Sequence, residues 1–227
     1  MTERRGVVVF DINETTLDMA PVRAVVDEVL GPDAGFSVWF PRLLQLSMTC
    51  TAIDRYVDFS TIARSALEAT AATVDRSLPD DAWDRVAAAI GSIEPHADVR
   101  DGLNRLRADG WSTMALTNSA PSTVDDHMQR NDLADLFDHV LTVEPVGAYK
   151  PDPRTYRHAA DVVRAELGSM WMVACHDWDL AGAHAVGMKT AFVERPSMKL
   201  ASALPSPDLS VRDFVDLAER LDGLSSI

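Results

Sequence analysis

The chain has 227 residues, of which 47% are hydrophobic, enough for one large α/β domain or for a core domain with a smaller insert. This composition excludes a disordered chain. The formal net charge of -14 excludes a general binder of nucleic acids or anionic membranes, because its mean field repels phosphate. Cys50 and Cys175 cannot build a disulfide framework and favour a reducing cytoplasm. We expect no targeting or membrane segment, since the longest apolar run, residues 170–175, is too short to cross a bilayer.

The first predicted element is a strand over residues 6–10, which are apolar and β-branched, as in strands that are buried on both faces. Residues 17–96 then contain no convincing strand. Helical patterns instead cover residues 21–30, 37–50, 59–73 and 79–90. We interpret this stretch as a helical insert that follows the first strand.

From residue 97 onward, predicted strands and helices alternate. The strands cover residues 113–116, 139–143, 171–174 and 190–193, and the helices cover residues 99–106, 121–130, 153–167 and 180–186. A last helix carries the apolar stripe Val211, Phe214, Val215, Ala218 and Leu221. The alternation predicts an α/β fold with a doubly wound parallel sheet, a Rossmann-like core. We expect a core domain over residues 1–16 and 97–227 and a helical cap domain over residues 17–96.

Polar residues follow four of the predicted strands. Because the carboxyl ends of parallel strands share one edge of a sheet, we expect these residues to meet in a single crevice below the insert. The four groups are Asp11, Asn13 and Thr15; Thr117, Asn118 and Ser119; Tyr149, Lys150 and Pro151; and His176, Asp177, Trp178 and Asp179.

The order of these motifs resembles the haloacid dehalogenase superfamily of hydrolases over nearly the whole chain. The resemblance is carried by Phe10-Asp11-Ile12-Asn13-Glu14-Thr15, Leu116-Thr117-Asn118-Ser119, Tyr149-Lys150-Pro151-Asp152 and His176-Asp177-Trp178-Asp179-Leu180-Ala181-Gly182-Ala183. It implies that Asp11 is a covalent nucleophile, and that the later motifs supply a hydroxyl, a lysine and acidic or polar groups. The helical insert corresponds to the family's small cap.

Two positions separate this chain from the phosphatases of that superfamily. Phosphatases carry a second aspartate two residues after the nucleophile, where this chain has Asn13, and an Mg²⁺-binding aspartate where it has Cys175. An amide cannot protonate a leaving alkoxide, and Mg²⁺ prefers carboxylate oxygen to a thiol. Trp178-Asp179, Tyr149-Lys150, Tyr156 and residues 55–59 instead resemble the 2-haloacid dehalogenase branch.

The chain also departs from that branch. Phe40 follows Trp39 where an arginine is usual, His176 stands in place of asparagine, and Glu14 stands where glycine is common. Arg42 lies two residues beyond Phe40, roughly 200° around a helix. We expect Pro41 to break the helix start so that Arg42 points into the cleft.

These features predict a hydrolase that converts short L-2-haloalkanoic acids into D-2-hydroxy acids through an ester on Asp11, with no metal and no cofactor. A small-molecule phosphatase and a degenerate, non-enzymatic binding member of the superfamily are the alternatives. A homodimer is left open. The predicted catalytic residues are Asp11, Thr15, Lys150, His176 and Asp179, and the predicted substrate-binding residues are Asn13, Phe40, Arg42, Thr117, Asn118, Tyr156 and Trp178.

Overall fold

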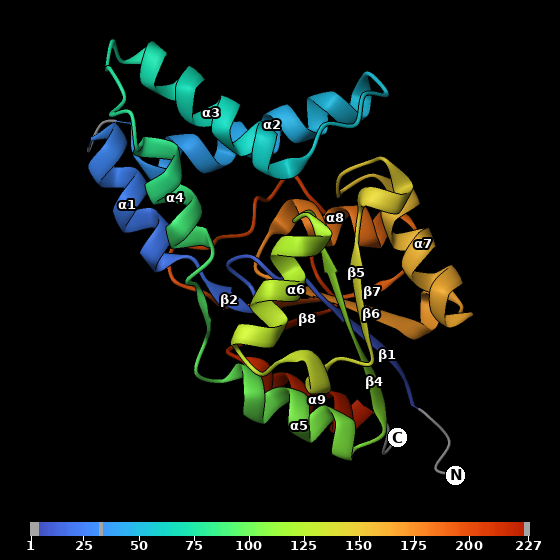
Figure 1. The fold of residues 1–227 in the computed structure, drawn as a ribbon. Coiled ribbons are helices and arrows are strands. Elements are labelled where there is room, and N and C mark those ends of the chain that lie inside the picture. Colours follow the sequence, from blue (N-terminus) through green and yellow to red (C-terminus); the bar gives the residue numbers. More distant parts are fainter. Residues whose placement is uncertain (1–4, 32–33, 225–227) are drawn as a thin grey trace.

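The structure is a computed structural model that describes residues 5–31 and 34–224. Its main sheet is six-stranded and wholly parallel (Figure 1). In spatial order the strands are β5 (His139–Thr142), β4 (Trp111–Thr117), β1 (Gly6–Phe10), β6 (Met170–Ala174), β7 (Lys189–Val193) and β8 (Leu209–Val211). The first strand of the chain therefore lies in the middle of the sheet, with β4 and β6 on its two sides.

Both faces of this sheet are covered, as its apolar strands require. In β1, Val8 and Phe10 belong to one buried cluster, while Val7 and Val9 belong to a second. The first cluster includes apolar residues of α5 (Val99–Ala108), α6 (Pro121–Arg130) and α9 (Phe214–Leu224). The second includes those of α7 (Pro153–Val163) and α8 (Asp177–Ala185). Three single-turn 3₁₀ helices complete this part: η1 (Ala134–Leu136), η2 (Glu144–Val146) and η3 (Leu167–Ser169).

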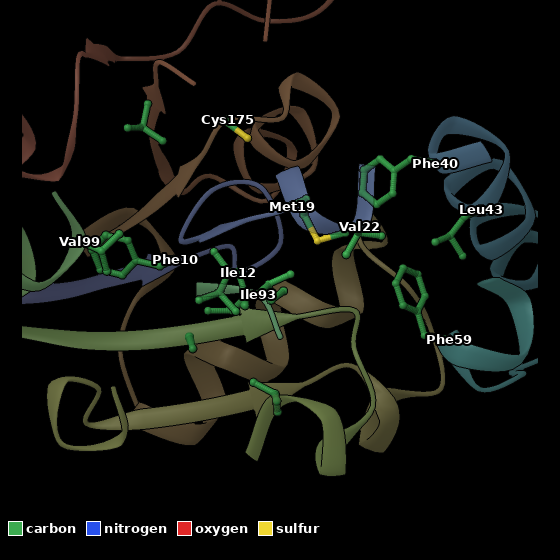
Figure 2. Close-up of a cluster of buried hydrophobic side chains, with 14 of the residues drawn as sticks. Phe10, Ile12, Met19, Val22, Phe40, Leu43, Phe59, Ile93, Val99 and Cys175 are labelled. Atoms are coloured by element: carbon green, nitrogen blue, oxygen red, sulfur yellow. The ribbon is translucent and has the colours of Figure 1, made fainter. Parts of the chain in front are cut away.

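Four helices form a separate layer beyond one end of the sheet (Figure 1). They are α1 (Ala20–Leu30), α2 (Phe36–Ala52), α3 (Phe59–Thr73) and α4 (Ala82–Ile90). The chain enters this layer through β2 (Leu17–Asp18) and returns through β3 (Glu94–Pro95), and these two short strands pair antiparallel. The first apolar cluster continues into the layer, from Phe10 and Ile12 to Phe40 and Phe59 (Figure 2).

The structure confirms the parallel α/β fold and the helical insert, with several corrections in detail. The insert does contain strands, namely the two-residue β2 and β3. Strand β8 was not predicted, and Val211 lies in it rather than in the last helix. Helix α7 ends at Val163 because Arg164 adopts a left-handed backbone conformation with φ 54°. In the described part of the chain, no helix is long and apolar enough to cross a membrane.

Candidate active site

Lys150 is fully buried and joins two carboxylates at the carboxyl end of the sheet. Its Nζ lies 2.8 Å from Asp11 Oδ1 and 2.7 Å from Asp179 Oδ2, and it donates a third hydrogen bond of 2.9 Å to the carbonyl of Leu116. All three donors of the ammonium are therefore used. Asp11 follows β1 and Asp179 lies in the first turn of α8, so the parallel topology brings them together.

The second oxygen of Asp11 has partners of its own. Thr15 donates its hydroxyl to Asp11 Oδ2 at 2.7 Å, and His176 Nδ1 lies 3.1 Å from the same oxygen. Thr15 Oγ1 in turn accepts a hydrogen bond of 3.0 Å from the backbone N–H of Cys175. The Asp11 side chain is thus held at both oxygens, and its orientation is fixed before any substrate binds.

These contacts determine the charge on Asp11. Burial alone would raise the pKa of this carboxyl, but the ammonium of Lys150 and the imidazole of His176 hold the pKa well below its ordinary value. Burial would likewise lower the pKa of Lys150, yet Asp11 and Asp179 raise it above the ordinary value. Asp11 is therefore an ionised, oriented carboxylate with a permanent counter-charge.

Asp179 lies behind this pair. Tyr156 donates its hydroxyl to Asp179 Oδ1 at 2.6 Å, while the other oxygen faces Lys150. Burial raises the pKa of Asp179, and the nearby charge of Asp11 raises it further, against the lowering effect of Lys150. Tyr156 is fully buried and contacts Asp179, so the structure gives it a place behind the carboxylate rather than a contact with substrate.

His176 lies between two carboxylates. Its Nε2 is 3.0 Å from Glu14 Oε2, on the side opposite Asp11, and its ring stacks on Trp178 with the centroids 5.2 Å apart. Burial opposes a charge on this imidazole, but Cys175, Asp11 and Glu14 together raise the pKa of His176 well above its ordinary value. His176 does not contact Asp179, because both oxygens of Asp179 face Lys150 and Tyr156.

A narrow pocket opens beside Asp11, between the core and the helical layer. Polar groups of the core form one wall, and aromatic and aliphatic side chains form the other. The lining consists of Asp11, Asn13, Thr117, Asn118, His176 and Trp178 from the core, and Phe40, Leu44 and Phe59 from the helical layer. Local hydrogen bonds hold the polar wall: Lys150 N–H donates to Asn118 Oδ1 at 3.0 Å, and Asn13 donates to Ser119 Oγ at 3.2 Å.

The structure does not bring Arg42 into this lining. Pro41 lies inside α2 and the helix continues past it, so Phe40 and Leu44, four residues apart, share the face toward the pocket. Arg42 is half-buried, and its Nε is covered without a hydrogen-bond partner among the described residues. The expectation that Pro41 would turn Arg42 inward is therefore wrong.

The donor set beside Asp11 does not fit a divalent metal. In the described residues, no three His, Cys, Asp or Glu side chains are arranged to hold a metal ion. The position between Asp11 and Asp179 that a cation would take is filled by the ammonium of Lys150, and the other Asp11 oxygen is bonded to Thr15 and faces His176. An Mg²⁺ ion would have to displace these groups.

Sequence reasoning gave no role to Glu14 or Leu44, and it named Phe59 and Ser119 only as members of their motifs. The sequence did offer one clue to Glu14, because this residue stands where the haloacid dehalogenases that the chain resembles commonly have glycine. It adopts φ 62°, a conformation that glycine reaches without strain. The roles of Leu44 and Phe59 depend on how the helical layer sits over the sheet, which no local pattern specifies.

Comparisons with known proteins place the chain in a family of hydrolases. The model of the haloacid dehalogenase-like hydrolases matches residues 6–187. The (S)-2-haloacid dehalogenase of Pseudomonas sp. (strain YL) is 28% identical over 222 residues, 95% of each chain. That of Pseudomonas fluorescens is 26% identical and covers 94% of this chain and 95% of its own length. The structure of the L-2-haloacid dehalogenase from Xanthobacter autotrophicus with chloropropionic acid covalently bound shares the fold, with a TM-score of 0.86, 23% identity and coverage of 98% and 100%.

Proposed function

Because the chain belongs to the haloacid dehalogenase-like hydrolases, we propose that it hydrolyses short L-2-haloalkanoic acids to D-2-hydroxy acids. The carrying observation is Asp11, a buried carboxylate that Lys150 keeps ionised at the wall of a narrow pocket. Asn13, rather than an acid, stands two residues beyond it. A halide leaves as a stable anion and needs no proton, so this arrangement suits halide displacement better than the release of an alkoxide.

In the first step, an oxygen of Asp11 attacks the halogen-bearing carbon from the side opposite the halogen. The new carbon–oxygen bond forms as the carbon–halogen bond breaks, and the halide leaves with the electron pair. The attack inverts the carbon, which converts the L configuration to D. Lys150 and Thr15 contribute by holding Asp11 charged and oriented.

In the second step, water attacks the carboxyl carbon of the Asp11 ester. The bond between this carbon and the substrate oxygen breaks, so the hydroxy acid leaves without a further change of configuration. One oxygen of the restored Asp11 then comes from water. We assign Asp179 to holding Lys150, since both its oxygens are bonded and it does not line the pocket in the described structure.

The residues that line the pocket suit a short substrate with one polar end. Asn13, Thr117 and Asn118 offer hydrogen-bonding groups for the carboxylate and the departing halide. Phe40, Leu44, Phe59 and Trp178 cover the opposite side with apolar surface. We assign these residues to substrate binding and leave Arg42 out.

The test is halide release from haloacetates and 2-halopropionates, in parallel with phosphate release from a panel of phosphoesters. We expect halide release that persists in excess chelator and that Asp11→Asn abolishes, because an amide is a very poor nucleophile. In a single turnover in ¹⁸O-labelled water, the label should enter Asp11 before it enters the product. Phosphate release that chelator stops and Mg²⁺ restores would favour the phosphatase. No turnover at all would favour a binding protein.

We infer that residues 17–96 act as a cap over a core of residues 1–16 and 97–227; residues 1–4, 32–33 and 225–227 lie outside the described structure. We place the protein in the cytoplasm, which the two unpaired cysteines support. A homodimer stays a prediction, which sedimentation at several protein concentrations would test.

A further inference from the structure

Three side chains form a continuous chain of contacts that ends at the nucleophile. Glu14 Oε2 lies 3.0 Å from His176 Nε2, and His176 Nδ1 lies 3.1 Å from Asp11 Oδ2. All three are buried, with exposed fractions of 7%, 7% and 5%. An imidazole held at one nitrogen by a carboxylate, with the other nitrogen at the reacting group, is the arrangement that general acid–base catalysis requires.

We propose that Glu14 and His176 form an acid–base relay for the hydrolysis of the ester on Asp11. His176 takes a proton from the attacking water, and Glu14 is a positioning residue that fixes the ring and passes the surplus proton outward. This inference rests on the proposed function, because it needs the ester to form.

Asp179, the other candidate base, is less accessible to the water that attacks the ester. Its two oxygens are committed to Lys150 at 2.7 Å and to Tyr156 at 2.6 Å, and it is screened from the pocket. His176 lines the pocket and is next to Asp11. A water molecule that reaches the ester carbon from the pocket therefore meets the imidazole rather than the carboxylate of Asp179.

Glu14 also lines a second cavity, whose lining includes neither Asp11 nor His176. This cavity has a volume of about 190 Å³, and its charged or titratable lining residues are Glu14, Asp18, Arg23, His96 and Arg195. Arg23 Nη2 lies 3.5 Å from Glu14 Oε1, and the exposed fraction of its side chain is 41%. The Glu14 carboxylate thus connects a buried imidazole to a cavity whose wall is partly open to solvent.

Hydrogen bonds from distant side chains hold the backbone at Glu14 and at the residue after it. Glu14 has φ 62°, and His96 Nε2 lies 2.9 Å from its carbonyl oxygen. Burial lowers the pKa of His96 and the charge of Arg195 lowers it further, so its neutral ring donates to that carbonyl. Arg195 is itself held by a paired contact with Asp98 and donates to the carbonyl of Thr15. Two successive backbone carbonyls, those of Glu14 and Thr15, are therefore held by side chains from distant parts of the chain.

The reaction releases a proton inside a buried site, and the relay would carry this proton away. Each turnover consumes one water and releases one halide, one hydroxy acid and one proton. One hydrogen of the water goes through His176 to the departing alcohol oxygen, and the other must leave the buried site. Glu14 and the cavity beside it provide a way out that does not cross the substrate pocket.

Formation of the ester also changes the charge around His176. In the free enzyme the groups that face its ring are Asp11, Glu14 and Cys175, and two of these are carboxylates. Esterification removes the charge of Asp11, so the imidazolium loses one of the anions that hold its proton. The ring then gives its Nδ1 proton to water in the pocket and keeps its Nε2–H donated to Glu14, so that Nδ1 is free to act as a base beside the ester.

The experiment uses the full chain and compares Glu14→Gln and His176→Asn with Asp18→Asn. Asp18 lines the same cavity but its side chain caps the start of α1 by accepting from Ala20 N–H at 2.9 Å, which asparagine can also do. Rapid-quench halide assays and intact-mass analysis follow formation of the ester and its decay. We expect both relay variants to release one halide per site quickly, to accumulate the ester, and to lose roughly 100-fold in kcat. Asp18→Asn should behave as the wild type.

A pH profile separates this role from a structural one. The rate of ester hydrolysis should follow the titration of an imidazole in the wild type, and that dependence should be absent from His176→Asn. Unchanged ester hydrolysis in both variants would overturn the relay, as would loss of the first halide burst. If the wild type itself releases no halide and forms no ester, the proposed function fails instead, which is a different result.

Discussion

The ammonium of Lys150 is fully buried and lies within hydrogen-bonding distance of two buried carboxylates and a carbonyl oxygen. Such an arrangement is stable only while all its members are present, because each buried charge depends on its partners. The same contacts orient Asp11 for attack. At this position the requirements of stability and of catalysis therefore coincide.

We predict that Lys150→Met abolishes halide release and lowers the free energy of unfolding by about 3–5 kcal/mol, since two carboxylates lose their counter-ion. Urea denaturation measures the loss. The double variant Lys150→Met with Asp179→Asn should recover part of it by removing one orphaned charge. The exposed Lys199 provides a matched control, and Lys199→Met should unfold as the wild type. Equal stability of the two lysine variants would contradict the role given to Lys150.

At the same scale, sequence reasoning found the residues but not the partners of His176 and Tyr156. Asp11, Lys150 and Asp179 were expected to converge because each follows a strand of a parallel sheet. The partners of His176 depend on the left-handed turn at Glu14, and the place of Tyr156 depends on the packing of α7 against α8. These are contacts between distant segments, which no local spacing reveals.

Among the elements, α2 shows how helical periodicity selects the pocket wall. Phe40 and Leu44 face the pocket, and Phe36 stacks on Phe40 with the ring centroids 5.1 Å apart. Arg42 lies about 200° around the helix from Phe40 and cannot share that face while the helix is continuous. Since Pro41 is accommodated inside α2, the wall of the pocket on this side is apolar.

We expect Arg42→Ala to retain halide release within roughly threefold of the wild type, because the residue does not line the pocket. Phe40→Ala removes an apolar wall and should lower kcat/KM by roughly 10- to 100-fold. Initial rates with 2-chloropropionate and 2-bromopropionate check both, and thermal melts show whether Phe40→Ala remains folded. A loss of tenfold or more in Arg42→Ala alone would mean that the guanidinium reaches the substrate after all.

The elements predicted from sequence were those with the strongest local patterns. The central strands are continuous apolar runs, and α3 and α6 begin and end where their sequence signals place them. Strand β8 has three residues, only one of them buried, and pairs with β7 from a distance in the chain. Strands β2 and β3 form only by pairing with each other, although the four inserted helices separate them in the sequence. Short elements that depend on distant partners leave little trace in the local sequence.

For the whole molecule, buried ionisable groups make the free energy of unfolding fall both at low pH and at high pH. Asp11 and Asp98 have pKa values below 3.8, their ordinary value; burial opposes this shift, but Lys150 in one case and Arg195 in the other outweigh it. The stability that they contribute is present above that pH and is lost as the pH falls through their lowered values. His176 has a pKa raised well above 6.5, so its contribution is complete below 6.5 and is lost as the pH rises through the raised value.

We therefore predict that thermal stability is greatest between about pH 4 and about pH 6.5 and declines on both sides. The net charge of -14 adds self-repulsion on the alkaline side, which salt screens, whereas the buried contacts of His176 are screened much less. Thermal melts from about pH 3 to about pH 9, at low and high salt, measure both effects. Asp98→Asn should flatten the acid limb, because asparagine does not titrate, and His176→Asn should flatten the alkaline limb that persists in high salt. An acid limb equally steep in Asp98→Asn would show that other carboxylates control it.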